Sequence, residues 1–151
     1  QDGLTPVYYA SAIAWINAQF APYPMEMGAT ARFIEAEADL KAGGTNWLTI
    51  LNTLRAADPK AAQLPPLTDP GTAAARVDLV FREKAIVTYL TMHRLGDMRR
   101  LIKYYGRGTE SVFPTGAYFK GGVYGTTVAN EPSLTEASTN PTWKVCTDKN
   151  P

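Results

Sequence analysis

The segment Phe81–Arg107 concentrates ionisable side chains in a stretch that otherwise reads as an apolar helix. These side chains are Arg82, Glu83, Lys84, His93, Arg94, Asp97, Arg99, Arg100 and Lys103. Three kinds of chemistry use such a set: acid–base or nucleophilic catalysis, contact with nucleic-acid phosphates, and ion pairs that hold helices together. The residues around them decide among the three.

Catalysis needs a nucleophile beside a base, or two carboxyl groups with different pKa values. Glu83, His93 and Asp97 are the candidates, and no Ser or Cys stands in a recognisable nucleophile motif. His93 is the only histidine, which excludes a metal site built from several histidines. We therefore expect no catalytic residue, no metal and no enzymatic activity. An enzyme would instead depend on His93 for turnover.

Contact with nucleic acid would use a run of basic and aromatic side chains. That run consists of Arg94, Arg99, Arg100, Lys103, Tyr104, Tyr105 and Arg107. The acidic residues Glu83 and Asp97 lie among these basic side chains, and the formal net charge of the whole chain is only +1. This balance favours no nucleic-acid partner.

A structural ion network fits the spacing best. Glu83 and Arg94 are eleven positions apart, about three turns of a continuous helix, so they would share one face. Asp97 can accept hydrogen bonds from Arg94 or Arg100. We predict that Glu83, Arg94, Asp97 and Arg100 form this network, in which loss of one buried partner costs about 3–5 kcal/mol.

The elements that position these residues are predicted to be mostly helices. The chain has 151 residues, of which 45% are hydrophobic and 19% charged, as is typical of a globular domain with a core. No apolar run approaches the ~20 residues of a membrane span. Apolar periodicity, caps, glycines and prolines predict helices over about 6–20, 29–42, 46–56, 72–94 and 98–105.

The second and third predicted helices are separated by only a few residues around Gly43 and Gly44. Such a short connection predicts an antiparallel helical hairpin of the tetratricopeptide-like type. One hairpin cannot bury its apolar face alone, so further helices must cover it.

The composition changes at Gly106, after which Gly, Pro, Ser, Thr and Asn dominate. The same part of the chain carries Phe113, Tyr118, Phe119, Tyr124 and Trp143. Because a flexible linker has no need of these rings, we predict a long, ordered, loop-rich aromatic tail that packs on the helices. The expected organisation is therefore a helical region over 1–105 and an extended tail over 106–151.

Three segments together resemble the C-terminal part of the SusD/RagB family. "RFIEAEADLKAGGTNWLTILNTLRA" resembles the family's helical hairpin, with an Ala-Glu-Ala core and a Leu-Asn-x-x-Arg ending. "FREKAIVTYLTMHRLGDMRRLIKYYGR" resembles its charged helix, in which Glu83, Arg94, Asp97 and Arg100 match. "EASTNP" resembles its closing Glu-x-x-x-Asn-Pro segment.

This resemblance implies a mostly α-helical lipoprotein exposed at the outer-membrane surface. Such a protein is the substrate-binding lid of a TonB-dependent, SusC-like transporter, with no enzymatic activity and no cofactor. The family has a longer N-terminal half with a lipidated cysteine, and the chain begins with a sequence typical of a mid-chain loop. We therefore expect a C-terminal portion whose partner includes the missing N-terminal half.

The implied ligands are glycans or peptides, bound by flat rings together with a few polar groups. The available aromatic platforms are Trp15, Tyr118, Tyr124 and Trp143. The alternative is a structural or assembly module. A helical fragment without its N-terminal half exposes apolar helix faces, which would pair with that half or with copies of the fragment itself.

Overall fold

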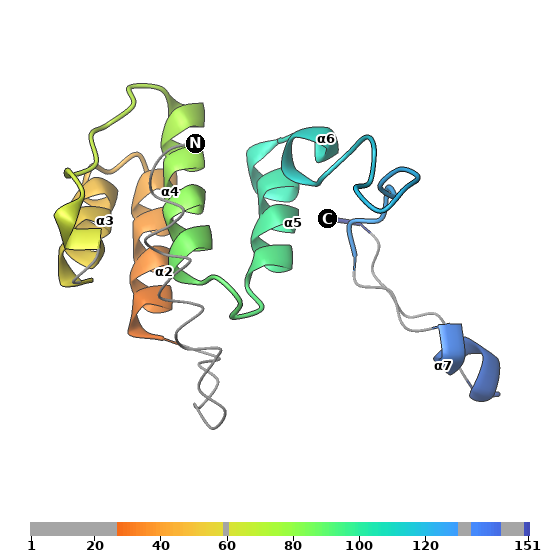
Figure 1. The fold of residues 1–151 in the computed structure, drawn as a ribbon. Coiled ribbons are helices and arrows are strands. Elements are labelled where there is room, and N and C mark those ends of the chain that lie inside the picture. The colour runs from red at the N-terminus through yellow and green to blue at the C-terminus, as the bar shows by residue number, and fades with distance from the viewer. Residues whose placement is uncertain (1–26, 59–60, 130–133, 143–149) are drawn as a thin grey trace. The chain divides into compact units, whose positions relative to one another are not determined.

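The computed structural model describes residues 27–58, 61–129, 134–142 and 150–151 (Figure 1). These residues are mostly helical, and no β-strand occurs among them. The elements in chain order are α2 (Gly28–Lys41), α3 (Asn46–Ala57), the 3₁₀ helix η1 (Ala61–Gln63), α4 (Ala73–Val87), α5 (Arg94–Tyr105), α6 (Thr109–Val112) and α7 (Leu134–Thr139). The helix predicted over 6–20 lies outside the described residues.

The chain divides into two compact units, Gln1–Arg94 and Leu95–Pro151. The change in composition at Gly106 coincides with the end of α5, whereas the units divide near the start of that helix.

In the first unit, α2 packs against α3 and α4 (Figure 1). Their shared core consists of Phe33, Ala36, Trp47, Ile50, Leu51 and Val80. Phe33 and Ala36 are one turn apart on α2, and Trp47, Ile50 and Leu51 follow helical spacing on α3. The apolar periodicity of the sequence therefore selects the buried face of both helices.

The turn between α2 and α3 depends on Asp39 and Gly44. A side-chain oxygen of Asp39 accepts a hydrogen bond from the backbone N–H of Trp47 at 2.8 Å. Thr45, the residue before α3, makes no side-chain cap hydrogen bond. Asp39, on the preceding helix, thus satisfies an N–H in the first turn of α3. A Cβ added at Gly44 would lie 2.2 Å from a carboxylate oxygen of Asp39.

The start of α4 is held by local hydrogen bonds. The Thr72 hydroxyl accepts from the N–H of Ala75 at 3.2 Å, as is typical of an N-cap residue. Just before it, Asp69 accepts two hydrogen bonds from Arg76, each of 2.8 Å, and one from the N–H of Gly71 at 2.9 Å. This exposed ion pair fixes the direction in which the chain enters the helix.

The prediction of one helix over 72–94 is wrong in its C-terminal part, because α4 ends at Val87. The Thr88 hydroxyl donates to the carbonyl oxygen of Lys84 at 2.8 Å, and the Thr91 hydroxyl donates to that of Thr88 at 2.6 Å. Leu90 and Met92 then adopt φ values of 64° and 65°. Threonine side chains that bond to the backbone compete with helical hydrogen bonding, so the chain turns here.

In the second unit, α5 ends at Tyr105 as predicted, and Gly106 follows with φ of 62°. This left-handed conformation is typical of a glycine after a helix. The segment that follows contains two short helices, α6 and α7, besides its loops. The Arg99 guanidinium on α5 donates to the carbonyl oxygen of Val128 at 3.2 Å and to that of Asn150, so it joins α5 to two separate parts of that segment.

Candidate functional site

Residues 116–125 of the second unit form a tight loop, here called the aromatic loop. The N–H of Tyr118 donates to the carbonyl oxygen of Gly122 at 2.9 Å, and that of Tyr124 donates to Gly116 at 3.0 Å. Gly116, Gly121 and Gly122 all have positive φ values, which side chains other than that of glycine rarely adopt. The glycines therefore allow the turn that brings Tyr118 and Tyr124 together.

Three aromatic rings meet in the aromatic loop. The ring centroids of Tyr118 and Phe119 are 4.7 Å apart, and those of Tyr118 and Tyr124 are 5.1 Å apart, both with edge geometry. Tyr118 and Tyr124 are half-buried, whereas Phe119 is 79% exposed. Tyr118 thus contacts both the half-buried Tyr124 and a phenylalanine that faces solvent.

The exposed ring of Phe119 lies beside a positive charge. The Nζ atom of Lys120 is 5.5 Å from the ring centroid, within the range of a cation–π contact. A flat apolar ring bordered by an ammonium group and by the ring of Tyr118 can pack on the apolar face of a sugar or on an apolar side chain. The neighbouring polar groups can accept or donate hydrogen bonds to the same ligand.

Two of the four predicted aromatic platforms come together in this loop. Tyr118 and Tyr124 are in contact, whereas Trp15 and Trp143 lie outside the described residues. Sequence reasoning missed Phe119, the most exposed ring of the cluster. Its position between Tyr118 and the Gly121-Gly122 pair was the available signal, since a turn at these glycines exposes the residues at its tip.

The charged side chains of the first unit make a different ion network from the one expected. Glu83 is buried, with its Oε1 atom 3.2 Å from Nη2 of Arg82 and its Oε2 atom 3.9 Å from Nε of Arg55. The predicted alignment of Glu83 with Arg94 required a continuous helix, and α4 ends between them. Arg94 is exposed, and no contact joins it to Glu83 in the described part of the chain.

The other predicted pair lies in the second unit. Nη1 of Arg100 is 3.9 Å from Oδ1 of Asp97, one turn away on α5, and Asp97 is buried. The four predicted network residues are therefore distributed over separate contacts rather than joined on one helix face.

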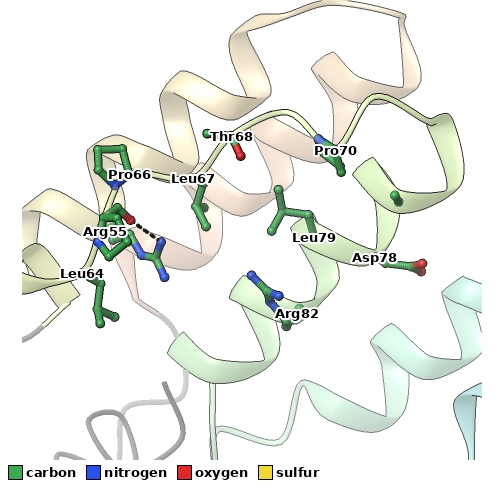
Figure 2. Close-up of a pocket in the computed structure, with 11 residues that line it drawn as sticks. Arg55, Leu64, Pro66, Leu67, Thr68, Pro70, Asp78, Leu79 and Arg82 are labelled. Atoms are coloured by element: carbon green, nitrogen blue, oxygen red, sulfur yellow. Dashed lines mark hydrogen bonds between the residues drawn. The ribbon is translucent and has the colours of Figure 1, made fainter. Parts of the chain in front are cut away.

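The last turn of α3 holds the proline-rich connection that leads to α4. Nη1 of Arg55 donates to the carbonyl oxygen of Pro65 at 2.9 Å, drawn as a dashed line in Figure 2. The Asn52 side chain donates to the carbonyl oxygen of Leu67 at 3.1 Å and accepts from its N–H at 2.8 Å. Asn52 and Arg55 belong to the Leu-Asn-x-x-Arg pattern, which was the only signal in the sequence that Arg55 is structural.

The three candidate catalytic side chains lie in different surroundings. Glu83 contacts two arginines, Asp97 pairs with Arg100, and His93 is half-buried in the turn before α5. Among the residues that the structure describes, no group of three His, Cys, Asp or Glu side chains could hold a metal ion. None of the described helices is long and apolar enough to cross a membrane.

Comparisons of the chain with protein-family models, with curated proteins and with solved structures find no significant match. The resemblance to the SusD/RagB family therefore stays a prediction.

Proposed function

We propose that the chain is the C-terminal portion of a SusD-like substrate-binding subunit that binds glycans or peptides at the cell surface. The observation that carries this proposal is the aromatic loop, in which Phe119 is 79% exposed and stands against Tyr118. Leaving a large apolar ring in water is unfavourable unless another surface covers it. A ligand with an apolar face is the cover that this function requires.

The resemblance of the sequence supports the wider assignment. In this wider assignment, the subunit acts as the lid of a SusC-like TonB-dependent transporter in the outer membrane. The lipid anchor and the remaining tetratricopeptide-like helices belong to the N-terminal half of the longer protein, which is the expected partner of the first unit.

The packing of α2 on α3 supports the tetratricopeptide-like part of the proposal. The two helices are joined by four residues, 42–45, and such a short connection makes neighbouring helices antiparallel. Ala36 is fully buried in the contact, so the small side chain lets the helices approach closely. In this proposal α4 covers the hairpin on one side as a neighbouring repeat would.

The aromatic loop is also the functional part of the proposed ordered tail. Hydrogen bonds from Arg99 on α5 to Val128 and Asn150 hold two parts of this tail in place. A loop whose C-terminal side is anchored in this way presents its rings with less loss of entropy on binding than a free segment.

The experiment that tests this proposal is a binding screen of the chain against arrays of glycans and of short peptides. The proposal predicts at least one ligand class that the unaltered chain retains and that Phe119→Ala does not. If Phe119→Ala retains every ligand equally, the aromatic loop is not the binding site.

A second candidate function, a structural or assembly module, is supported by exposed apolar side chains of the first unit. Ile34 is 55% exposed, Leu90 43% and Met92 81%. Apolar surface of this kind favours association with the N-terminal half or with another copy. Sedimentation of the chain distinguishes this candidate, since a single monomeric species of 16.5 kDa at all concentrations would contradict self-assembly.

A further inference from the structure

A groove lies between the proline-rich connection and α4 in the first unit (Figure 2). Its volume is about 580 Å³, which is large enough for a small ligand. Leu67 from the connection and Leu79 from α4 supply apolar walls. Arg55 and Arg82 also line it, so two guanidinium groups border an apolar space.

The two guanidinium groups share one carboxylate. Oε2 of Glu83 is 3.9 Å from Arg55 and its Oε1 is 3.2 Å from Arg82, which places the two arginines next to one another. Two positive charges against one negative charge leave an excess positive charge at this end of the groove. Such a charge, partly removed from water, favours the approach of an anion.

Arg55 is the less satisfied of the two arginines. Its side chain is 7% exposed, and its buried Nε atom has no hydrogen-bond partner in the described part of the chain. Among the described residues, its one hydrogen bond is that from Nη1 to the carbonyl oxygen of Pro65. A guanidinium carries five N–H donors, so Arg55 can donate to a further acceptor without losing the bond to Pro65.

We propose that this groove binds the carboxylate of a ligand that also carries an apolar group. The carboxylate lies against Arg55 and Arg82, and the apolar group lies between Leu67 and Leu79. Charge-assisted hydrogen bonds from guanidinium groups to a carboxylate are among the strongest in proteins. This site lies in the first unit and does not depend on the aromatic loop or on the function proposed for it.

Asp78 limits the charge of the ligand. It lines the groove on the side away from Arg55, as Figure 2 shows. A second negative charge on the ligand would approach this carboxylate and be repelled. The groove therefore favours a monocarboxylate, such as the C-terminus of a peptide or a free aliphatic acid, over a dicarboxylate whose second carboxylate lies at the far end of the ligand.

Calorimetric titration of the whole chain with N-acetyl-leucine, N-acetyl-leucinamide and hexanoate tests the proposal. The first probe represents a peptide C-terminus, the second is its neutral equivalent, and the third is a free aliphatic acid. We expect N-acetyl-leucine to bind at least roughly tenfold more tightly than its amide, because the amide lacks the charge-assisted hydrogen bonds. Hexanoate binding with similar affinity would identify the ligand as any aliphatic carboxylate, and weaker hexanoate binding would identify it as a peptide end.

Two variants locate the binding in the groove. Arg82→Gln removes the more exposed guanidinium, and Ala75→Leu fills the groove without changing a charge. Both are expected to weaken N-acetyl-leucine binding at least roughly tenfold. Arg32→Gln is the matched control, because Arg32 is an exposed arginine of the same unit that pairs with Glu35 outside the groove.

Three results would overturn the proposal. They are the absence of binding of both acids at millimolar concentration, equal binding of the acid and its amide, and unchanged binding in both groove variants. Thermal unfolding of each variant is measured in parallel. If Arg82→Gln lowers the melting temperature, the binding result for Ala75→Leu alone tests the proposal.

Discussion

Arg55 of α3 and Glu83 of α4 face each other inside the first unit, with Nε and Oε2 3.9 Å apart and side chains only 7% and 5% exposed. The pair links α3 to α4. Arg55 also donates to Pro65, so one side chain connects α3, α4 and the segment between them.

Glu83→Gln should therefore destabilise the first unit. The substitution keeps the size of the side chain but leaves the buried guanidinium of Arg55 without its charge partner, at a cost of about 3–5 kcal/mol. Urea unfolding followed by circular dichroism measures the change. Arg94→Ala is the control, since Arg94 is exposed and we expect an effect within about 0.5 kcal/mol. A larger loss at Arg94 than at Glu83 would contradict this network.

Gly44→Ala should destabilise the turn between α2 and α3. The added Cβ would lie 2.2 Å from the Asp39 carboxylate, which accepts the N–H of Trp47. Displacing Asp39 leaves that N–H without its partner, which costs about 1–3 kcal/mol. Gly28→Ala is the matched control, because no atom lies within 4 Å of its added Cβ. Equal melting temperatures of the two variants would show that Asp39 does not hold this turn.

The ion pair of Asp69 and Arg76 predicts a small pH dependence of stability. The hydrogen bond from Arg76, and then that from the N–H of Gly71, lower the pKa of Asp69 below its ordinary value of 3.8. A group whose pKa is lower in the folded state stabilises the fold above its unfolded pKa. That contribution is lost as the pH falls through the folded pKa, and it is weak because the pair is exposed.

Asp69→Asn checks this pH dependence. We expect a slightly lower melting temperature than that of the unaltered chain at neutral pH, and convergence of the two in strong acid. Added salt should reduce the difference at neutral pH, because it screens exposed charges. A difference that grows as the pH falls would contradict the assignment.

The aromatic loop should depend on the backbone conformation of Gly121. Its φ of 101° is one that alanine adopts only with strain, so Gly121→Ala should disfavour the turn by about 1–2 kcal/mol. The tyrosine signals in near-ultraviolet circular dichroism should weaken as Tyr118 and Tyr124 separate. Gly125→Ala, with no positive φ and no atom within 4 Å of the added Cβ, should leave these signals unchanged. Retention of the signals in Gly121→Ala would mean that the loop does not need this turn.

Local patterns in the sequence were sufficient to predict α2 and α3. The spacing of Phe33 and Ala36, and of Trp47, Ile50 and Leu51, reports burial on one helix face, and those residues form the core. The end of α4 could not be predicted in this way. Apolar periodicity continues past Val87, whereas the hydroxyls of Thr88 and Thr91 bond to the backbone and end the helix.

Ion pairs between residues that lie far apart in the sequence could not be predicted from it either. Glu83 was expected to pair with Arg94 on its own helix, but its partners are Arg82 and the distant Arg55. Spacing along one helix predicts neighbours on that helix, whereas the choice of a partner on another helix depends on packing. For the candidate site, aromatic composition indicated Tyr118 and Tyr124, and only the loop geometry shows the exposure of Phe119.

The measurement that tests the central claim most directly is calorimetric titration of a ligand retained on the glycan or peptide arrays. It is titrated into the unaltered chain, into Phe119→Ala and into Val123→Ala, which removes a neighbouring apolar side chain that is 77% exposed. Loss of a stacking contact should weaken binding by about 1–3 kcal/mol, or roughly fivefold to a hundredfold, in Phe119→Ala, with little change in Val123→Ala. Equal affinity of all three proteins would contradict a substrate-binding role for the aromatic loop.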